Sequence, residues 1–189
     1  LSEWLELGKP RILPDTDLVA LPGCFSADAI DQGSKFLIDS LTQELKGNGA
    51  DLGCGYGYLT KSVLQRPNKI TSMDLFEIDW RALECAKINL SAESNSCNLS
   101  FYWQDARVGI PKQKYDWIIM NPAFHERGFE SEALGISMIK CAAIGLRPDG
   151  RLYFVANRKL PYEGDLKRAF PNWREIASSG NFKVIEARK

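Results

Sequence analysis

The chain has 189 residues, of which 44% are hydrophobic and 25% charged, and this predicts one globular domain with a substantial core. Its 24 basic and 24 acidic side chains cancel, which excludes a global electrostatic field that attracts nucleic acid; an RNA partner would have to bind a local patch. Nothing in it resembles a signal peptide or an apolar run of about 18 residues, so we expect a soluble protein with no membrane partner.

Cysteine and histidine usage argues against a metal site. The five cysteines are scattered without a C-x-x-C pair, and the single histidine, His125, has no cysteine nearby. A disulfide framework and a zinc site are both disfavoured, so we expect no metal and a reducing cytoplasm. The chain starts at Leu1 rather than Met, which is consistent with the C-terminal part of a longer protein.

The first 47 residues predict lead-in strands followed by a helix. Three prolines interrupt the apolar alternation of residues 1–25, and proline cannot donate to a central ladder, so short strands or an edge hairpin are expected. From Ser34, apolar residues recur at helical spacing as far as Leu45, and Gly47 ends this predicted helix.

Strands alternate with helices through the core, residues 48–189. The expected strands are 48–50, 69–76, 99–103, 115–120, 151–156, 175–177 and 182–187; the expected helices are 58–64, 80–90, 131–146 and 165–170, with a turn at 147–150. This alternation predicts an α/β fold with a mostly parallel sheet and helices on both faces. The last two strands are close enough along the chain to pair as a hairpin, so an antiparallel last strand is expected. Ligands of such sheets bind beyond the carboxyl ends of the strands.

The first core strand runs into residues 51–57 (DLGCGYG), where an acidic residue precedes three glycines at alternating positions. A helical pattern follows at once, so the chain turns sharply from strand into helix. Glycines there tolerate positive φ and, lacking Cβ, let a ligand lie against bare backbone. The turn suits a nucleotide-like cofactor; a plain tight loop is the alternative, because a glycine-rich turn alone is a weak signal.

Acidic residues end the next two strands. Glu77 lies 20 residues after Gly57, where a carboxylate accepts hydrogen bonds from both ribose hydroxyls of an adenosine. Asp74 competes for this role but falls within the strand, and a solvated acidic cluster is the alternative. Asp105, followed by Ala106, ends the third strand and is placed to accept from an adenine amino group, although such a residue by itself is more often a turn residue than a ligand.

The sharpest local signal is the run Asn121-Pro122-Ala123-Phe124-His125, which follows the most apolar strand. The side-chain amide oxygen of Asn121 and the backbone carbonyl oxygen of Pro122 are two acceptors that can hold an exocyclic amino group. An aromatic residue two positions further on can stack on the attached ring. The alternative is a strand-terminating turn, since Asn-Pro commonly starts one.

These runs resemble a known family. Residues 51–57 resemble motif I of class I S-adenosylmethionine-dependent methyltransferases, and 121–124 resemble their Asn-Pro-Pro-Phe/Tyr amino-methylation motif. Residues 22–26, 31–34 and 155–163 further resemble the ribosomal RNA small subunit methyltransferase C type, the guanine-N2 methyltransferases. The resemblance covers nearly the whole chain as that family's C-terminal catalytic domain.

The resemblance implies a Rossmann-like domain over residues 1–189 with a seven-stranded, mostly parallel sheet. It implies S-adenosylmethionine (AdoMet) as cofactor and methyl transfer to N2 of a guanine in ribosomal RNA. The cofactor-binding residues that it implies are Gly33, Ser34, Asp51, Gly53, Cys54, Gly55, Gly57, Glu77, Asp105, Ala106 and Asn121. The catalytic residues that it implies are Asn121, Pro122 and Phe124. Gly33 and Ser34 are otherwise simple turn residues.

One motif position departs from the family, because Ala123 replaces its second proline. This frees φ and loosens the loop, but the acceptor carbonyl of Pro122 survives, so activity is expected. Two alternatives keep the fold: amino-methylation of DNA adenine N6 or a protein glutamine amide, and a non-catalytic RNA-binding or ribosome-assembly domain.

Contact with ribosomal RNA or a ribosomal subunit is expected at the C-terminal end. Residues 151–189 hold nine Lys or Arg and four acidic residues, a net charge of +5, and such a patch supplies salt-dependent phosphate contacts. Arg158 and Lys159 are the proposed RNA contacts, with His125 in an RNA-contacting or structural role. Ordinary solvated faces are the alternative, and the oligomeric state is left open.

Overall fold

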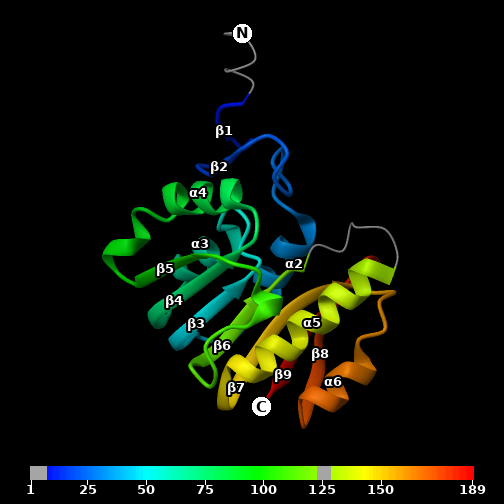
Figure 1. Cartoon of the computed structure of the whole chain (residues 1–189). Helices are drawn as coiled ribbons and strands as arrows, with labels where there is room; N and C mark the ends of the chain where they lie inside the picture. Colours follow the sequence, from blue (N-terminus) through cyan, green and yellow to red (C-terminus); the bar gives the residue numbers. More distant parts are fainter. Residues whose placement is uncertain (1–7, 123–128) are drawn as a thin grey trace.

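The computed structural model describes residues 8–122 and 129–189, with the backbone alone for 129–132. A seven-stranded sheet runs through it in the order β5-β4-β3-β6-β7-β9-β8 (Figure 1). Its strands are β3 (Lys46–Leu52), β4 (Lys69–Glu77), β5 (Asn98–Trp103), β6 (Tyr115–Met120), β7 (Leu146–Asn157), β8 (Asn172–Ser178) and β9 (Phe182–Arg188). All pairs from β5 to β7 are parallel, and β9 is antiparallel to both β7 and β8. The expected mostly parallel sheet with an antiparallel last strand is confirmed.

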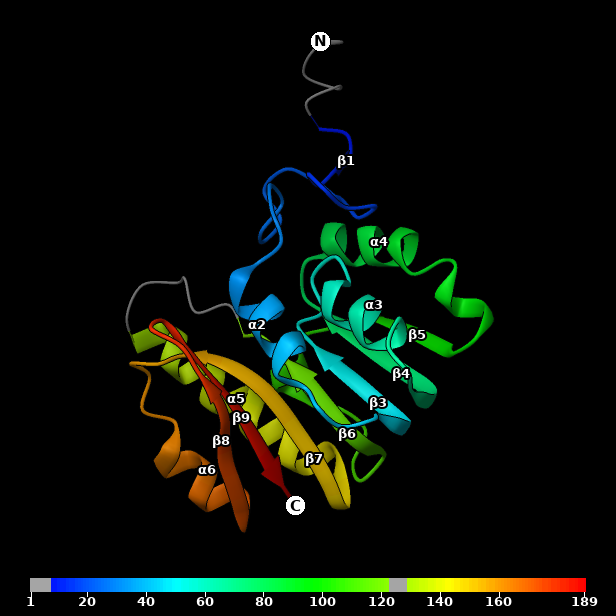
Figure 2. The ribbon, with the colours of Figure 1, turned by 180° about the vertical axis from the view of Figure 1, so that it is seen from behind.

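Helices cover both faces of this sheet. They are α2 (Gln32–Ser40), α3 (Tyr58–Leu64), α4 (Trp80–Asn89), α5 (Phe129–Gly145) and α6 (Glu163–Ala169), with short 3₁₀ turns at Glu93–Asn95 and Ala106–Val108. Helices α5 and α6 lie on the face seen in Figure 1, whereas α2 and α3 lie on the face seen in Figure 2. Side chains of a strand alternate between the two cores: Ile118 and Met120 pack toward α5, and Trp117 and Ile119 pack toward α2 and α3.

The lead-in segment forms the expected edge hairpin. Strands β1 (Arg11–Ile12) and β2 (Val19–Ala20) pair antiparallel as a separate two-stranded sheet. The side chain of Asn89, at the end of α4, accepts from the Val19 amide at 2.8 Å and donates to the Val19 carbonyl at 2.8 Å. This pairing attaches the hairpin to the core.

The leading helix is shorter than expected. It ends at Ser40 rather than near Leu45, because the guanidinium of Arg66 donates to the carbonyl oxygens of Ile38 and Leu41 and satisfies the helix end. Leu45 is buried just before β3, which begins at Lys46. The expected boundary between residues 47 and 48 therefore cuts through a core strand.

The prediction of a turn at residues 147–150, with a strand only from Arg151, is also wrong. Strand β7 is continuous from Leu146, with a register shift opposite β6 and Asp149 at φ 67°. The Asp149 amide donates to the Lys189 carbonyl, and the Lys189 amide donates to the Gly150 carbonyl, both at 3.0 Å. Pairing with the last residue of the chain keeps the Pro-Asp-Gly run inside the sheet as a bulged segment.

Candidate functional site

Two adjoining hollows lie at the carboxyl ends of the parallel strands, where ligands of such sheets bind. The larger has a volume of about 160 Å³ and the smaller about 40 Å³. Both are lined by Phe25, Gly53, Gly55 and Asn121. The larger is also lined by Phe76, Glu77, Ile78, Gln104, Asp105, Ala106, Arg107, Pro122, Leu134 and Met138. The smaller is also lined by Asp31, Ser34, Cys54, Tyr56, Tyr58 and Leu59.

The glycine turn after β3 requires its glycines. Gly53, Gly55 and Gly57 adopt φ of 75°, 54° and 90°, a region that L side chains rarely occupy. The amides of Gly53 and Cys54 both donate to the Phe76 carbonyl, at 2.8 and 3.1 Å, which ties the turn to the end of β4. A Cβ on Gly55 would meet no atom of the described residues within 4 Å, so its bare backbone is open to a ligand.

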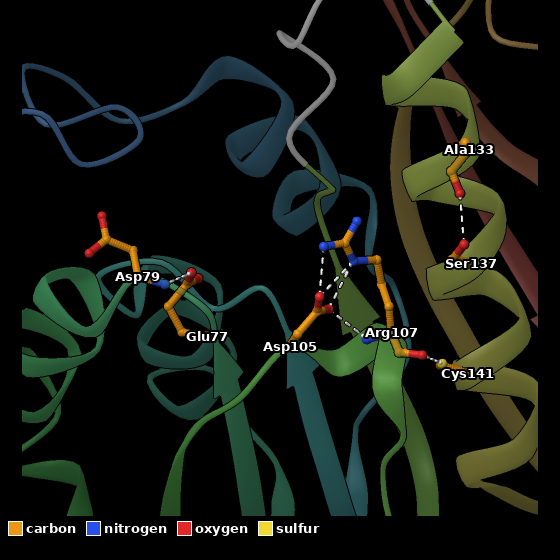
Figure 3. A network of polar contacts seen from close by, with 7 residues as sticks. All are labelled: Glu77, Asp79, Asp105, Arg107, Ala133, Ser137 and Cys141. Carbon is orange, nitrogen blue, oxygen red and sulfur yellow. Dashed lines mark hydrogen bonds and ion pairs between the residues drawn. The ribbon is translucent and has the colours of Figure 1, made fainter.

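Glu77 is oriented by backbone donors. Its Oε2 accepts from the Gly55 amide at 2.8 Å. Its Oε1 accepts from the Asp79 amide at 2.9 Å, and Figure 3 shows this second bond. The residue is 9% exposed. A carboxylate has about four lone-pair positions, so about two remain after these bonds for ligand hydroxyl groups.

Asp51 is the first residue of the turn and is fully buried. Its Oδ2 accepts from the Thr60 hydroxyl at 2.7 Å, whereas its Oδ1 has no partner among the described residues. Burial raises the pKa of Asp51 to about 7; the bond from Thr60 opposes this shift, and the charge of Glu77 adds to it. An unpaired buried oxygen beside a second carboxylate makes this end of the site favourable for a cation.

Asp105 begins the 3₁₀ turn after β5 and is already held by a cation. The guanidinium of Arg107 donates to both of its carboxylate oxygens, at 2.9 Å from Nε and 2.6 Å from Nη2 (Figure 3). This pairing holds the pKa of Asp105 below its usual value. A ligand amino group at this edge therefore meets an ionised carboxylate with an arginine beside it.

Asn121 follows β6 directly and reaches across to the start of α2. Its Nδ2 donates to Asp31 Oδ2 and to Ser34 Oγ, each at 2.7 Å. Both donors of the amide are thus used, and Oδ1 is the group left to accept. Pro122 is buried and lines the larger hollow.

The expected site residues fall into three groups. Asp51, Gly57 and Gly33 do not line the hollows: Asp51 lies beneath the turn, a Cβ on Gly57 would lie 3.3 Å from the Cβ of Ala86, and one on Gly33 would lie 3.2 Å from Phe182. Two others, Phe124 and His125, lie outside the described residues. The residues brought together around the hollows are Ser34, Gly53, Cys54, Gly55, Glu77, Asp105, Ala106, Asn121 and Pro122.

Arg158 and Lys159 are exposed at the end of β7, on the edge of the sheet where the other strand ends gather. Four of the other basic residues in 151–189 lie at a different place on the surface. Arg151, Lys167, Arg174 and Arg188 line another hollow, and Arg151 and Arg174 both pair with Glu186 there. The tail is therefore not one continuous patch.

Sequence reasoning missed several lining residues. Phe25 and Asp31 stand in the runs 22–26 and 31–34, which indicate the family, but neither of these two residues was assigned a role. Arg107 lies two positions after Asp105, and its charge was a usable signal. Met138 arrives from the middle of α5, and its Cε would lie 3.6 Å from a Cβ on Gly53, a contact that no local pattern encodes.

Within residues 8–122 and 129–189, no three His, Cys, Asp or Glu side chains converge as metal ligands would. None of the helices in those ranges combines the length and apolar character that crossing a bilayer requires. All five cysteines are free and buried.

Comparisons with known proteins agree with this geometry. The chain matches the family model of the methyltransferase small domain over residues 15–186. It is 36% identical over 170 residues to ribosomal RNA small subunit methyltransferase C of Photorhabdus laumondii, a match that covers 89% of the chain and 49% of that relative. It is 31% identical over 187 residues to ribosomal RNA large subunit methyltransferase G of Alcanivorax borkumensis, covering 92% and 47%.

Among solved structures, a 16S rRNA N2 methyltransferase from T. thermophilus in complex with AdoMet and guanosine matches with a TM-score of 0.77 and 26% identity. That match covers 96% of this chain and 50% of the other. The chain thus spans about half the length of the curated relatives and of the solved structure that it matches.

Proposed function

The chain belongs to the methyltransferase small domain family, and from this premise we propose that it transfers the methyl group of AdoMet to the N2 amino group of a guanine in ribosomal RNA. One observation carries the proposal: Asn121 presents an acceptor oxygen beside the glycine turn, because both of its amide donors are bound elsewhere. The relatives named above, and the solved structure with guanosine, support the choice of substrate.

The residues around the hollows fit AdoMet. The bare backbone of Gly53 and Gly55 leaves room for its methionine portion, and the oriented carboxylate of Glu77 suits ribose hydroxyls. Asp105 and Ala106 line the larger hollow, and we propose that the adenine binds against them. The unpaired buried oxygen of Asp51 makes a positively charged ligand favourable nearby. When bound, AdoMet supplies a methyl group activated by its sulfonium.

The protein's own task is to position the guanine. The base must leave its stack, at a cost of a few kcal/mol. Asn121 Oδ1 and the Pro122 carbonyl then accept from the two amino protons, which helps localise the nitrogen lone pair toward the methyl group. Phe124 is proposed to stack on the base, and His125 to contact RNA. Catalysis then comes mostly from positioning and needs no metal.

The partner that we propose is ribosomal RNA or a ribosomal subunit, with Arg158 and Lys159 contacting phosphates beside the site. A cytoplasmic location is part of this proposal and is supported by five free cysteines. We also propose that residues 1–189 form one methyltransferase domain, since the family model covers nearly all of them.

Methyl incorporation from labelled AdoMet tests the proposal. Unmodified ribosomal RNA, duplex DNA and a glutamine-containing protein substrate are offered separately, and label is expected in the RNA alone. Label in DNA or protein would move the substrate to another amino group. A chain that binds no AdoMet in calorimetry would instead be a non-catalytic domain.

A further inference from the structure

We propose that Asp31 is a positioning residue that holds the side-chain amide of Asn121 with its oxygen toward the substrate. The inference rests on the proposed function, because it assigns a cause to the acceptor on which that function depends. Asp31 and Asn121 are 90 residues apart in sequence and meet where the start of α2 approaches the end of β6.

The carboxylate of Asp31 makes two bonds through one oxygen. As the residue that caps α2, it accepts from the Ser34 amide at 2.7 Å through Oδ2. The same Oδ2 accepts from Asn121 Nδ2 at 2.7 Å. The helix cap thus fixes the position of the carboxylate, and the carboxylate then fixes the amide.

This contact permits only one orientation of the amide. An ionised carboxylate has no proton to donate, so turning the Asn121 amide over would place its oxygen 2.7 Å from Asp31 Oδ2 with nothing between them. The Ser34 hydroxyl, which accepts from the same nitrogen, does not make this distinction, because it could also donate. Asp31 alone therefore decides that an acceptor, and not a donor, faces the hollow.

Gly33 acquires a role from the same geometry. A Cβ there would lie 3.0 Å from Asp31 Oδ2 and 3.2 Å from Cε1 of Phe182. The glycine leaves the space that the carboxylate needs in order to cap the helix and bind Asn121 together. We therefore assign Gly33 to the support of Asp31 rather than to cofactor contact.

The orientation of the Asn121 amide selects which substrate groups can bind, according to whether they donate or accept hydrogen bonds. A site that presents an acceptor binds exocyclic amino groups and rejects a carbonyl oxygen at the same place, since that would leave two acceptors facing each other. Asp31 thus acts on substrate orientation without touching the substrate.

The test uses Asp31→Ser, Asn121→Asp and the double variant. Serine is as good a helix cap as aspartate, so Asp31→Ser should keep the melting temperature of the wild type. Its hydroxyl can donate to Asn121 Oδ1 as well as accept from Nδ2, so it no longer fixes the orientation of the amide, and kcat at saturating AdoMet should fall about 10- to 100-fold. In Asn121→Asp, two carboxylates face each other and activity should be lower still. In the double variant the hydroxyl introduced at position 31 can donate to the carboxylate introduced at position 121, and part of the lost activity should return.

A second readout does not depend on turnover. The side-chain NH₂ of Asn121, assigned by its disappearance in Asn121→Ala, should exchange its protons with water at least about 10-fold faster in Asp31→Ser than in the wild type, because the carboxylate that holds it in place is gone. The matched control is Asp39→Ser, which removes an exposed carboxylate on the same helix that pairs with Lys35, and it should change neither quantity.

Unchanged exchange and unchanged kcat in Asp31→Ser would overturn the proposal, as would a double variant whose activity is only the product of the two single losses. If the wild type transfers no methyl group to RNA but exchange still accelerates in Asp31→Ser, the proposed function fails while the positioning contact stands.

Discussion

The Gly55 amide donates to Glu77 Oε2 at 2.8 Å, so the glycine turn after β3 and the carboxylate that ends β4 form one unit. The backbone contact matters because it aims the carboxylate before any ligand arrives. Preorganisation of this kind reduces the entropy that is lost when side chains are ordered on binding. The glycine turn and Glu77 therefore line the site together, although Gly55 and Glu77 are 22 residues apart in sequence.

Replacing Gly55 by alanine should weaken AdoMet binding and stability together. Its φ of 54° costs an alanine about 1 to 2 kcal/mol. The added Cβ also projects into the open space that a ligand would fill, so the AdoMet dissociation constant measured by calorimetry should rise at least about 10-fold, which corresponds to about 1.4 kcal/mol. Gly180→Ala, which also meets nothing within 4 Å and has no positive φ, should match the wild type in both measurements.

Replacing Gly49 by alanine should destabilise the sheet. A Cβ at this position in β3 would lie 2.3 Å from Cζ2 of Trp117, whose indole lies across the glycine. Overpacking of this kind costs about 1 to 3 kcal/mol, measured as the free energy of unfolding in urea. Trp117→Phe removes the crowded ring, so the double variant should lose less than the sum of the two single changes; simple additivity would contradict the packing account.

The stability of the ligand-free protein should carry a pH dependence that comes from Asp51. The pKa of its carboxyl is about 7 in the folded chain, against an ordinary value of 3.8, so between these values the folded chain keeps a proton that the unfolded chain releases. Stability therefore falls as pH rises from about 4 to about 7, and the loss is complete above about 7.

Asp51→Asn removes this titration, so its unfolding free energy relative to the wild type should increase from about pH 5 to about pH 8. AdoMet affinity of the wild type should rise over the same range as the carboxylate ionises, and that rise should be absent in the variant. A difference in stability that stays constant with pH would show that Asp51 does not titrate there.

Reversing the charges at Arg158 and Lys159 should weaken RNA binding without affecting AdoMet. Loss of two phosphate contacts should reduce the slope of log affinity against log salt by about 2. The same double reversal at Lys69 and Lys87, two exposed cations on β4 and α4, is the control and should leave the slope near that of the wild type. An unchanged slope for the first variant would place the RNA contact elsewhere.

Much of the fold follows from local patterns in the sequence. The bounds of α3 and β6 agree with expectation at both ends, because their apolar periodicity is interrupted by turn residues on either side. The end of α2 could not be predicted, since Leu41 and Leu45 continue the helical spacing and Arg66, which terminates the helix, is distant in sequence.

Some residues of the candidate site could likewise be predicted from the sequence and others could not. The glycine turn, Glu77 and Asp105 could be expected to converge because parallel strands end at one edge. Met138 and Phe25 could not, since tertiary packing alone brings α5 and the lead-in segment to that edge. The close approach of the Trp117 indole to Gly49 is likewise a tertiary contact that no local pattern predicts.

The most direct test of the central claim is nucleoside analysis of unmodified ribosomal RNA after incubation with the protein and AdoMet. The wild type should yield N2-methylguanosine at a defined position. Asn121→Ala should bind AdoMet normally and yield at least about 100-fold less of it, the loss typical of removing one group that acts at the reacting centre. Methylation at another atom, or undiminished turnover by Asn121→Ala, would contradict the account.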